Sequence, residues 1–370
     1  MKDETKLFWA SADCLRVNAY KKIIEFYGDL DAAKDAILDP KKSVLLLKHD
    51  LQQIGIQQKS IEKILEKTKK VDLPQQEENL KKYGAIVLCH DDEEFPHSLK
   101  NIDDAPVFLF AKGDFSKLTR KSLAVVGSRT ITNEGKWACS HLLPELSQAG
   151  FTIVSGMALG IDTLAHKEAI KHGSPTVAFW GTGLDIVYPS VNQKLALEIM
   201  QNGVVFSEFP FGTSPTPYNF PRRNRLVSGY SDGVLVVEGK EKSGSLITAQ
   251  FAMEQGKDVF AVPGPIRSPL SRGPHKLIQE GAKLVQYASD VLEAFGVTQN
   301  SLFAQENVHQ CLPKNADEKN VYNVLSYSAM HFDEIVRKTT ISAPKLSSIL
   351  MMMSLSGAVE ELSSAGWVRR

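Results

Sequence analysis

Short apolar runs that alternate with amphipathic stretches form the central pattern of this chain. After two runs at 85–88 and 107–110, six more follow at 123–126, 152–154, 176–179, 204–206, 233–237 and 258–262. Stretches of helical spacing, such as 162–172 and 248–255, lie between most of them. This alternation indicates βαβ units, and therefore a doubly wound, mainly parallel sheet with helices on both faces. We expect Pro144 to kink the first of these helices or to end it early.

The first part of the chain, residues 1–75, has helical spacing without strand-like runs and predicts a small all-helical module. Gly28-Asp29 and Asp39-Pro40 are turn signals within it. Gly55 separates two further helical stretches, as in SAM or helix-hairpin-helix modules. Such an arrangement can hold a phosphate at a helix N-terminus, although a simple turn at Gly55 explains the same residues.

The last part of the chain predicts a linker and a further small domain. Residues 297–317 lack periodicity, which is typical of a linker. Residues 318–370 predict three helices followed by a two-stranded hairpin, which is the winged-helix layout. We expect Ser342 to cap the third helix, with Pro344 in its first turn. Because that helix has few polar or basic positions, we expect this domain to make protein contacts rather than to read duplex DNA as a transcription regulator would.

Composition narrows the partners that such a chain can have. The 370 residues include 43 Lys plus Arg and 43 Asp plus Glu, so the formal net charge is zero. This balance argues against a uniformly basic, histone-like surface, so nucleic acid would have to bind a local basic patch. On composition alone, a metabolic enzyme is the favoured interpretation.

The cysteines give no sign of a metal site or a disulfide framework. They are far apart, at Cys14, Cys89, Cys139 and Cys311, and no two form a CxxC pair. This usage is typical of a reducing compartment. The first residues lack the apolar core of a signal peptide, and no stretch approaches the length of a membrane span. We therefore expect a cytoplasmic protein without metal, cofactor or membrane association.

Several predicted strands end in loops of small, hydroxyl-bearing or basic residues. In a doubly wound sheet, ligands bind at these carboxyl ends. After the strand at 123–126, Gly127 lets the backbone approach an anion, Ser128 offers a hydroxyl and Arg129 offers a guanidinium. By itself this segment is equally typical of a tight strand-to-helix turn. Similar loops follow later strands, at 155–162, 181–185, 243–248 and 262–264.

The loop at 155–162, which follows the strand at 152–154, is glycine-rich, but it matches neither GxGxxG nor a P-loop. Ser155, Gly156 and Gly160 would form a phosphate-accepting loop at a helix N-terminus. We interpret Asp162 as the cap of that helix and His166 as a packed side chain, in preference to an acid–base pair.

The segment Tyr218-Asn219-Phe220-Pro221-Arg222-Arg223-Asn224-Arg225 places three arginines beside two aromatic rings. Rings can stack bases while guanidiniums hold phosphates, as in a single-strand groove. The alternative is an arginine cluster held in ion pairs. Only Glu208 and Asp232 lie nearby in sequence, so we expect the pairing to be incomplete.

The loop Ser243-Gly244-Ser245 offers further backbone N–H groups and hydroxyls for phosphate. No nucleophile–base pair, GxSxG, HExxH or cluster of carboxylates accompanies these loops in the sequence. The pattern therefore favours polyanion binding over bond breaking, and we expect no enzyme activity.

Taken in order, seven motifs resemble the signature of the DNA-processing protein A (DprA/Smf) family. They are VGSR, SGMALGIDTLAH, GTGLDIVYP, SEFP, FPRRNRLVSG, VVEGKEKSGSLITA and VFAVPG, within roughly residues 85–290. The resemblance implies an extended Rossmann-like domain over 76–296 that binds single-stranded DNA without strong sequence preference. It also implies a homodimer that loads a RecA-type recombinase during natural transformation and recombination. The flanks resemble the family's N-terminal helical module and its C-terminal winged helix.

The resemblance further implies a basic pocket beside the glycine loops. It assigns DNA contacts to Arg129, Lys194, Arg223 and Arg225. The other members of the predicted DNA-binding set are Gly127, Ser128, Ser155, Gly156, Gly160, Asn224, Ser243, Gly244 and Ser245.

The sequence departs from the family pattern at a few positions near this pocket. These are Asn133-Glu134-Gly135, where the family has a tyrosine and a glycine, and Trp180, where a smaller or aliphatic residue is usual. Arg222 falls at a variable position. None of these differences touches the basic positions assigned to DNA.

The main alternative is a nucleotide-processing enzyme on a related Rossmann-like fold. Phosphoribohydrolases that resemble the lysine-decarboxylase-like group depend on a Pro-Gly-Gly-x-Gly-Thr loop and on a catalytic Arg and Glu. The nearest segment here, Val262-Pro263-Gly264-Pro265, lacks that loop. A hydrolysis assay on nucleoside monophosphates separates the two hypotheses.

Overall fold

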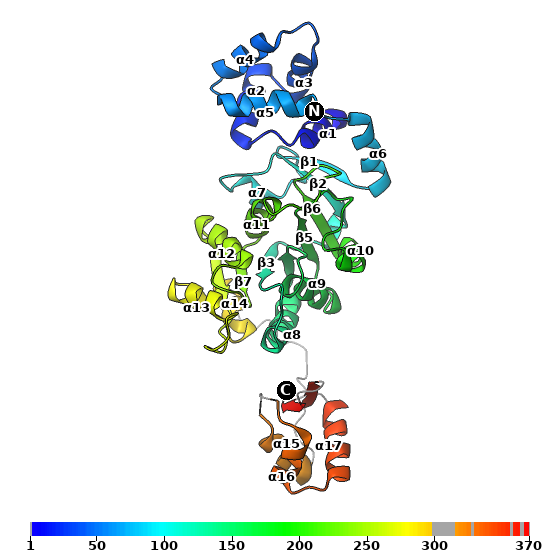
Figure 1. Ribbon diagram of the computed structural model, residues 1–370, viewed down its shortest axis with the longest axis vertical. Coiled ribbons are helices and arrows are strands. Elements are labelled where there is room, and N and C mark those ends of the chain that lie inside the picture. The colour runs from blue at the N-terminus through cyan, green and yellow to red at the C-terminus, as the bar shows by residue number, and fades with distance from the viewer. Residues whose placement is uncertain (1, 298–314, 327–328, 356–357, 363–365, 370) are drawn as a thin grey trace. The chain divides into compact units, whose positions relative to one another are not determined.

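The computed structural model forms two compact units with separate hydrophobic cores. The first unit extends to residue 299 and the second begins at residue 300. The structure describes residues 2–297, 315–326, 329–355, 358–362 and 366–369 (Figure 1). Most of the predicted linker, and Cys311, lie outside the described residues. In the described part of the chain, no helix combines the length and the apolar character that a membrane crossing requires.

A nine-stranded sheet forms the centre of the first unit, in the order β1-β2-β6-β5-β4-β3-β7-β8-β9. Neighbouring strands are parallel from β6 to β9 in this order, whereas β1 and β2 extend the β6 edge in antiparallel pairing. The strands are β1 (Ile86–Cys89), β2 (Phe108–Gly113), β3 (Lys121–Val126), β4 (Phe151–Ser155), β5 (Thr176–Trp180), β6 (Gly203–Ser207), β7 (Gly233–Val236), β8 (Asp258–Ala261) and β9 (Lys283–Leu284). The predicted α/β class and its mainly parallel sheet are confirmed. Only β9 was not predicted, because its two exposed residues carry no hydrophobic pattern.

The helices cover both faces of the sheet because the chain moves away from β3 in two directions. It passes from β3 to β6 on one side and from β7 to β9 on the other, and right-handed crossovers then place the connecting helices on opposite faces. The helices are α7 (His97–Lys100), α8 (Asn133–Gln148), α9 (Ile161–Lys171), α10 (Gln193–Asn202), α11 (Asn219–Tyr230), α12 (Gly244–Glu254), α13 (Arg272–Gln279) and α14 (Ala288–Ala294).

Helix α8 continues through Pro144 to Gln148, so the expectation of an early end is wrong. Leu142, Leu143 and Leu146 beside the proline are at most 2% exposed. Their burial stabilises the helix and offsets the backbone hydrogen bond that proline cannot donate.

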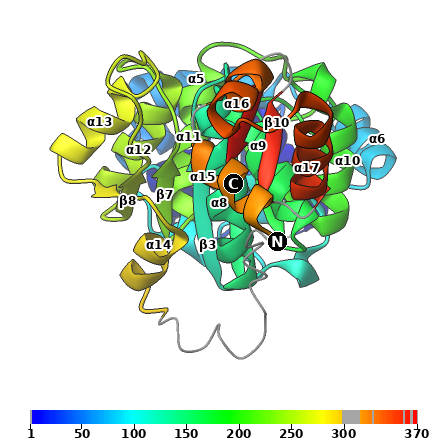
Figure 2. The ribbon, with the colours of Figure 1, turned by 90° about the horizontal axis from the view of Figure 1, so that it is seen from below.

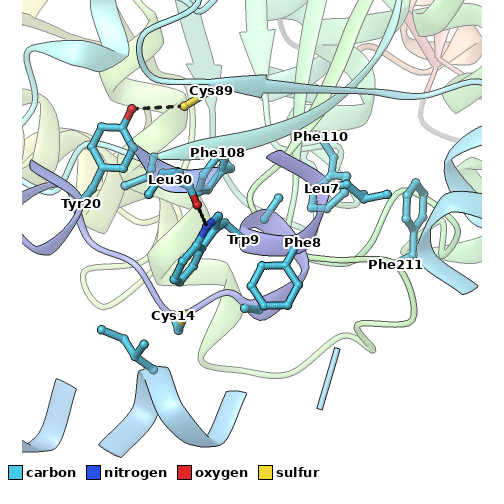
Figure 3. Close-up of a cluster of buried hydrophobic side chains, with 14 of the residues drawn as sticks. Leu7, Phe8, Trp9, Cys14, Tyr20, Leu30, Cys89, Phe108, Phe110 and Phe211 are labelled. Atoms are coloured by element: carbon cyan, nitrogen blue, oxygen red, sulfur yellow. Dashed lines mark hydrogen bonds between the residues drawn. The ribbon is translucent and has the colours of Figure 1, made fainter. Parts of the chain in front are cut away.

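Six helices form the N-terminal module: α1 (Asp3–Ala12), α2 (Val17–Tyr27), α3 (Leu30–Leu38), α4 (Val44–Gln53), α5 (Gln58–Thr68) and α6 (Leu73–Tyr83). Leu7 and Trp9 of α1 share one buried cluster with Phe108 and Phe110 of β2 (Figure 3). The Trp9 indole N–H donates to the Leu30 carbonyl at 3.2 Å and so fixes α1 against α3. The module therefore shares a core with the antiparallel edge of the sheet.

Gly55 lies between α4 and α5 with a φ of +72°. The Lys22 ammonium donates to the Gly55 carbonyl at 2.8 Å. This geometry fits the simple turn that the sequence allowed, because the left-handed conformation there favours glycine.

The described residues of the second unit form three helices and a hairpin: α15 (Ala316–Val324), α16 (Phe332–Thr339), α17 (Ala343–Leu355), β10 (Val359–Leu362) and β11 (Gly366–Arg369) (Figure 2). Its core includes Val321, Ile335, Leu346 and Val359, one residue from each helix and one from the hairpin. The predicted winged-helix layout is confirmed, with Ser342 directly before α17 and Pro344 in its first turn.

Candidate nucleic-acid interface

The loops after β3 and β4 pack closely against each other at the carboxyl edge of the sheet. Gly160 has a φ of +80°, and a side chain there would overlap the Ser128 carbonyl. That carbonyl accepts a hydrogen bond from the Ile161 N–H at 3.1 Å. A side chain at Gly127 would overlap Ile161. The two glycines therefore allow the first two loops of the predicted site to meet.

Arg129 leaves this junction as an exposed side chain. Its guanidinium carbon lies 5.6 Å from the centre of the Phe220 ring, which is within cation–π range. The Phe220 ring centre is in turn 5.6 Å from that of Tyr188. Tyr188 is 43% exposed and Tyr218 is 88% exposed. We call Arg129, Tyr188, Tyr218 and Phe220 the strand-end surface.

The sequence singled out Tyr218 and Phe220 as candidate stacking residues, but not Tyr188. Tyr188 lies in the loop after β5, whereas Phe220 is in the first turn of α11. Parallel strands bring their carboxyl ends to one edge. The position of Tyr188 in a loop after such a strand was therefore the signal that could have assigned it to the site.

Arg223 lies beneath this surface and is only 4% exposed. Its guanidinium donates to the carbonyls of Gly156 and Phe179, and so it joins the loop after β4 to the end of β5. A side chain at Gly156 would overlap the guanidinium. Burial and the like charge of Arg129 lower the pKa of Arg223 to about 10, and the Asp162 carboxylate opposes that shift. Arg223 is thus mainly enclosed by the loops that it holds together.

Asp162 lies in the first turn of α9, and its carboxylate accepts hydrogen bonds from the N–H groups of Gly156 at 3.1 Å and Ala158 at 3.4 Å. Gly160 occupies the N-cap position, so the interpretation of Asp162 as the helix cap is wrong. The carboxylate instead satisfies two backbone donors of the preceding loop. Burial raises the pKa of Asp162.

His166 is fully buried, and its Nδ1 lies 2.7 Å from the Thr176 hydroxyl oxygen. Burial, with a smaller effect of the Arg223 charge, lowers the pKa of His166 to about 3. The side chain is therefore neutral at physiological pH, as expected of a packed histidine.

Two arginines of the 222–225 segment are engaged in ion pairs, so the expectation of incomplete pairing is wrong for them. Arg225 is 4% exposed, and its Nη2 lies 2.6 Å from the Glu208 carboxylate. Arg222 contacts Asp13 at 2.7 Å and Glu208 at 2.9 Å. Asp13 comes from the distant N-terminal module, which is why sequence proximity missed it.

The remaining predicted residues divide into buried supports and exposed groups. The Ser155 hydroxyl is buried and donates to the Val125 carbonyl at 2.7 Å. At the start of α12, Asn224 Nδ2 donates to the Gly244 carbonyl at 3.1 Å, and the Ser243 and Ser245 hydroxyls lie 2.7 Å apart. Lys194, in the first turn of α10, is an exposed cation whose side chain is 91% accessible.

The described residues contain no cluster of three or more His, Cys, Asp or Glu side chains placed to hold a metal ion. The geometry combines exposed cations and rings at one sheet edge with tightly packed glycine loops below. Such a surface can hold phosphates while bases stack, which is the chemistry of single-strand binding.

The chain is also similar to known proteins. The sequence model of the family described as DNA recombination-mediator protein A matches residues 86–296, and that of the DprA winged helix domain matches residues 311–364. The DNA processing protein DprA of Bacillus subtilis (strain 168) is 46% identical over 202 residues, which cover 54% of this chain and 68% of that protein.

Two solved structures are also similar. That of DNA processing protein A from Streptococcus pneumoniae matches with a TM-score of 0.63 and 36% identity, covering 78% of this chain and 95% of that one. The structure of DNA processing protein A from Helicobacter pylori matches with a TM-score of 0.52 and 31% identity. It was described for the single-stranded DNA binding mode of that protein. It covers 57% of this chain and 95% of the Helicobacter chain.

Proposed function

Because this chain belongs to the DNA recombination-mediator protein A (DprA/Smf) family, we propose that it binds single-stranded DNA at the strand-end surface. The observation that carries the proposal is the arrangement of Arg129 over Phe220, with Tyr188 beside that ring. A cation and exposed rings at one edge suit a polymer with alternating phosphates and bases. Neither kind of contact depends on base identity, so weak sequence preference follows.

The residues of the predicted set have different parts in this proposal. Exposed Arg129 and Lys194 hold phosphates, while Tyr188 and Tyr218 stack bases. Arg223 keeps the loops in place and adds positive potential from below. The same supporting part belongs to the buried or tightly packed residues, which are Gly127, Ser128, Ser155, Gly156, Gly160 and Arg225. Asn224 and the loop Ser243-Gly244-Ser245 offer a second phosphate contact at the start of α12.

Family membership supports the wider role as well. We propose that the protein acts in the cytoplasm as a homodimer, without catalysis, and brings a RecA-type recombinase onto single-stranded DNA during natural transformation and recombination. The neutral, buried His166 supports the non-catalytic part, because such a group is unsuited to exchanging protons with a substrate at neutral pH.

The proposal is tested by measuring the binding of a labelled oligothymidine and of a duplex of equal length over a salt series. We expect the single strand to bind more tightly. Arg129→Glu should weaken that binding by about tenfold or more, because a charge-assisted contact is lost and a like charge is added. It should also flatten the plot of log K against log salt by about 0.7 for each phosphate contact removed.

The matched control is Arg120→Glu. Arg120 is also an exposed arginine, but it precedes β3 whereas Arg129 follows it, so the two lie at opposite edges of the sheet. If Arg120→Glu weakens binding as much as Arg129→Glu does, general charge rather than the strand-end surface is responsible. Preferential binding of the duplex would also contradict the proposal. Assembly of recombinase filaments on the bound oligothymidine, with and without Arg129→Glu, then tests the mediator role.

A further inference from the structure

A cavity of about 320 Å³ is lined in part by Thr132, at the end of the loop that joins β3 to α8. It lies between the first turns of α8, the end of β7 and the loop after β8. β3 and β7 are neighbours from which the chain proceeds in opposite directions, and such a switch point is where doubly wound sheets hold ligands. The described residues that line it do not include any member of the predicted DNA-binding set.

Glu238 supplies the charge at the inner end of this cavity. Its side chain is only 8% exposed, and its carboxylate accepts hydrogen bonds from the Thr132 N–H at 3.2 Å and from the Thr132 hydroxyl. Thr132 is the N-cap of α8, and a side chain at Gly135 would overlap the carboxylate. Glu238 thus already occupies the place that the helix N-terminus offers to an anion. A phosphate is therefore disfavoured there.

Each carboxylate oxygen accepts one of these bonds and keeps a further lone pair for a donor from the cavity. Much of the remaining wall is apolar, from Ala138, Val262, Pro263 and Pro265. Glu134 and Arg267 are the other charged residues of the lining. A ligand that suits both features is flat and apolar on its faces and carries N–H donors on one edge.

The cavity is held open by hydrogen bonds between the segments around it. The Gly239 N–H donates to the Leu270 carbonyl at 2.7 Å, and the Gly273 N–H donates to the Gly239 carbonyl at 2.9 Å. His275 Nε2 lies 2.9 Å from the Gly264 carbonyl oxygen. These contacts tie the loop after β8 to the end of β7, so the cavity does not need a ligand to form.

We propose that this cavity binds a nucleobase that presents adjacent N–H donors to Glu238, with guanine as the best match. Guanine carries ring and exocyclic N–H donors side by side, which can meet both oxygens of one carboxylate. Thymine has a single N–H between two carbonyls, and these would face the negative charge. The volume lies at the lower end of the roughly 300–1,000 Å³ of small-molecule sites and suits a base or nucleoside.

The base can come from a free nucleotide or from one position of a bound strand, and the test separates these sources. In the first arm, guanosine and thymidine are titrated into the full-length chain by calorimetry. In the second arm, one thymidine of an oligothymidine is replaced by deoxyguanosine at successive positions. Each arm is repeated with Glu238→Gln and with Ala138→Leu, which fills the cavity from α8 without touching Thr132.

We expect guanine to be preferred over thymine by about tenfold or more in at least one arm, since two charge-assisted hydrogen bonds are at stake. Both variants should remove this preference. Thermal unfolding shows whether Glu238→Gln remains folded, and Ala138→Leu gives an answer that is independent of the Thr132 contact.

Preference in the first arm alone assigns the cavity to a free nucleoside, and preference in the second alone assigns it to a base of the bound strand. Equal binding of guanine and thymine in both arms would overturn the proposal, as would a preference that survives both variants. The second arm rests on the proposed DNA binding. Guanosine binding without oligothymidine binding would reject that function and leave the cavity proposal standing.

Discussion

The sequence identified Arg223 as a residue of the site, but it did not predict that its side chain would be buried. The aromatic and arginine-rich segment predicted a cation that faces a ligand, but the guanidinium is 4% exposed and donates to two carbonyls. Composition reveals that an arginine is present. It does not reveal that Gly156 leaves room for it beneath the loop.

Arg223→Met should therefore act first on stability. It removes the donor to Gly156 and Phe179 and leaves Asp162 buried without its nearby cation. A hydrogen bond from a charged donor contributes about 1.5–3 kcal/mol, so the loss of two should lower the free energy of unfolding, measured with urea, by about 3–5 kcal/mol. Arg223→Lys, which keeps the charge, should lose less. Equal stability of wild type and Arg223→Met would mean that these contacts do not hold the loops.

His166 predicts a pH dependence of stability. Its pKa is about 3 in the folded protein and about 6.5 when unfolded. Between these values the unfolded state takes up a proton that the folded state does not, so each fall in pH favours unfolding. From pH 6.5 to 4.5 this contributes a loss of about 2–3 kcal/mol.

The measurement compares urea unfolding of wild type and His166→Gln over that pH range. The glutamine does not titrate, so the variant should lose less stability on acidification, whatever its stability at pH 7. Arg223 is the charged group that acts on His166, and it remains in the variant, so its effect largely cancels in the comparison. Parallel pH profiles for the two proteins would contradict the prediction.

At the level of elements, α11 links parts of the first unit that are far apart in sequence. Successive helix positions point about 100° apart, so neighbouring residues reach different partners. Phe220 contacts Tyr188, Arg222 reaches Asp13 of the N-terminal module, and Arg223 reaches Gly156. The helix thus connects the N-terminal module with the strand-end surface.

The Arg222–Asp13 contact should couple the N-terminal module to α11 energetically. Both side chains are at most 20% exposed, and Arg222 also lies over the Phe209 ring at 4.8 Å. Arg222→Gln should lower the free energy of unfolding by about 2 kcal/mol. In a double-mutant cycle, adding Asp13→Asn should cost less than it does in wild type.

Lys276 and Glu280 supply the matched control for that cycle. They form an exposed pair at the C-terminal end of α13, where Glu280 is the C-cap. Their charged groups are 3.7 Å apart, and both side chains are nearly half accessible. Pairs of this kind contribute about 0–1 kcal/mol. A coupling energy for Arg222 and Asp13 no larger than that of the control would show that the contact does not join the module to α11.

The strands could be predicted from the sequence, but most contacts between polar side chains could not. Apolar runs such as 123–126 and 258–262 predicted β3 and β8 closely, because a strand covered on both faces must be apolar along its length. The partners of polar side chains were less predictable. Glu208 lies only 14 residues from Arg222 and was already noted as a nearby carboxylate. Asp13 lies 209 residues away and meets Arg222 only after the chain has folded, so local spacing carries no record of that contact.

At the scale of the whole molecule, the chain consists of two units with separate cores. The strand-end surface belongs entirely to the first. In the second, the cation at the start of α17, Lys345, lies 2.5 Å from Asp317, and Met351 and Met352 are more than 60% exposed on the same helix. A duplex-reading helix would be expected to present polar and basic groups there, so the expectation of protein contacts stands as a prediction.

This division predicts that a chain ending at residue 299 keeps the DNA affinity of the full chain. The shortened chain retains every residue of the predicted DNA-binding set and the whole core beneath them. We expect its dissociation constant for oligothymidine to lie within about twofold of the full-length value, a difference of less than 0.5 kcal/mol, with an equally cooperative thermal transition. A tenfold loss with the fold intact would show that the second unit binds DNA. In that case Lys319 and Arg337, basic residues of α15 and α16, would be the first positions to replace.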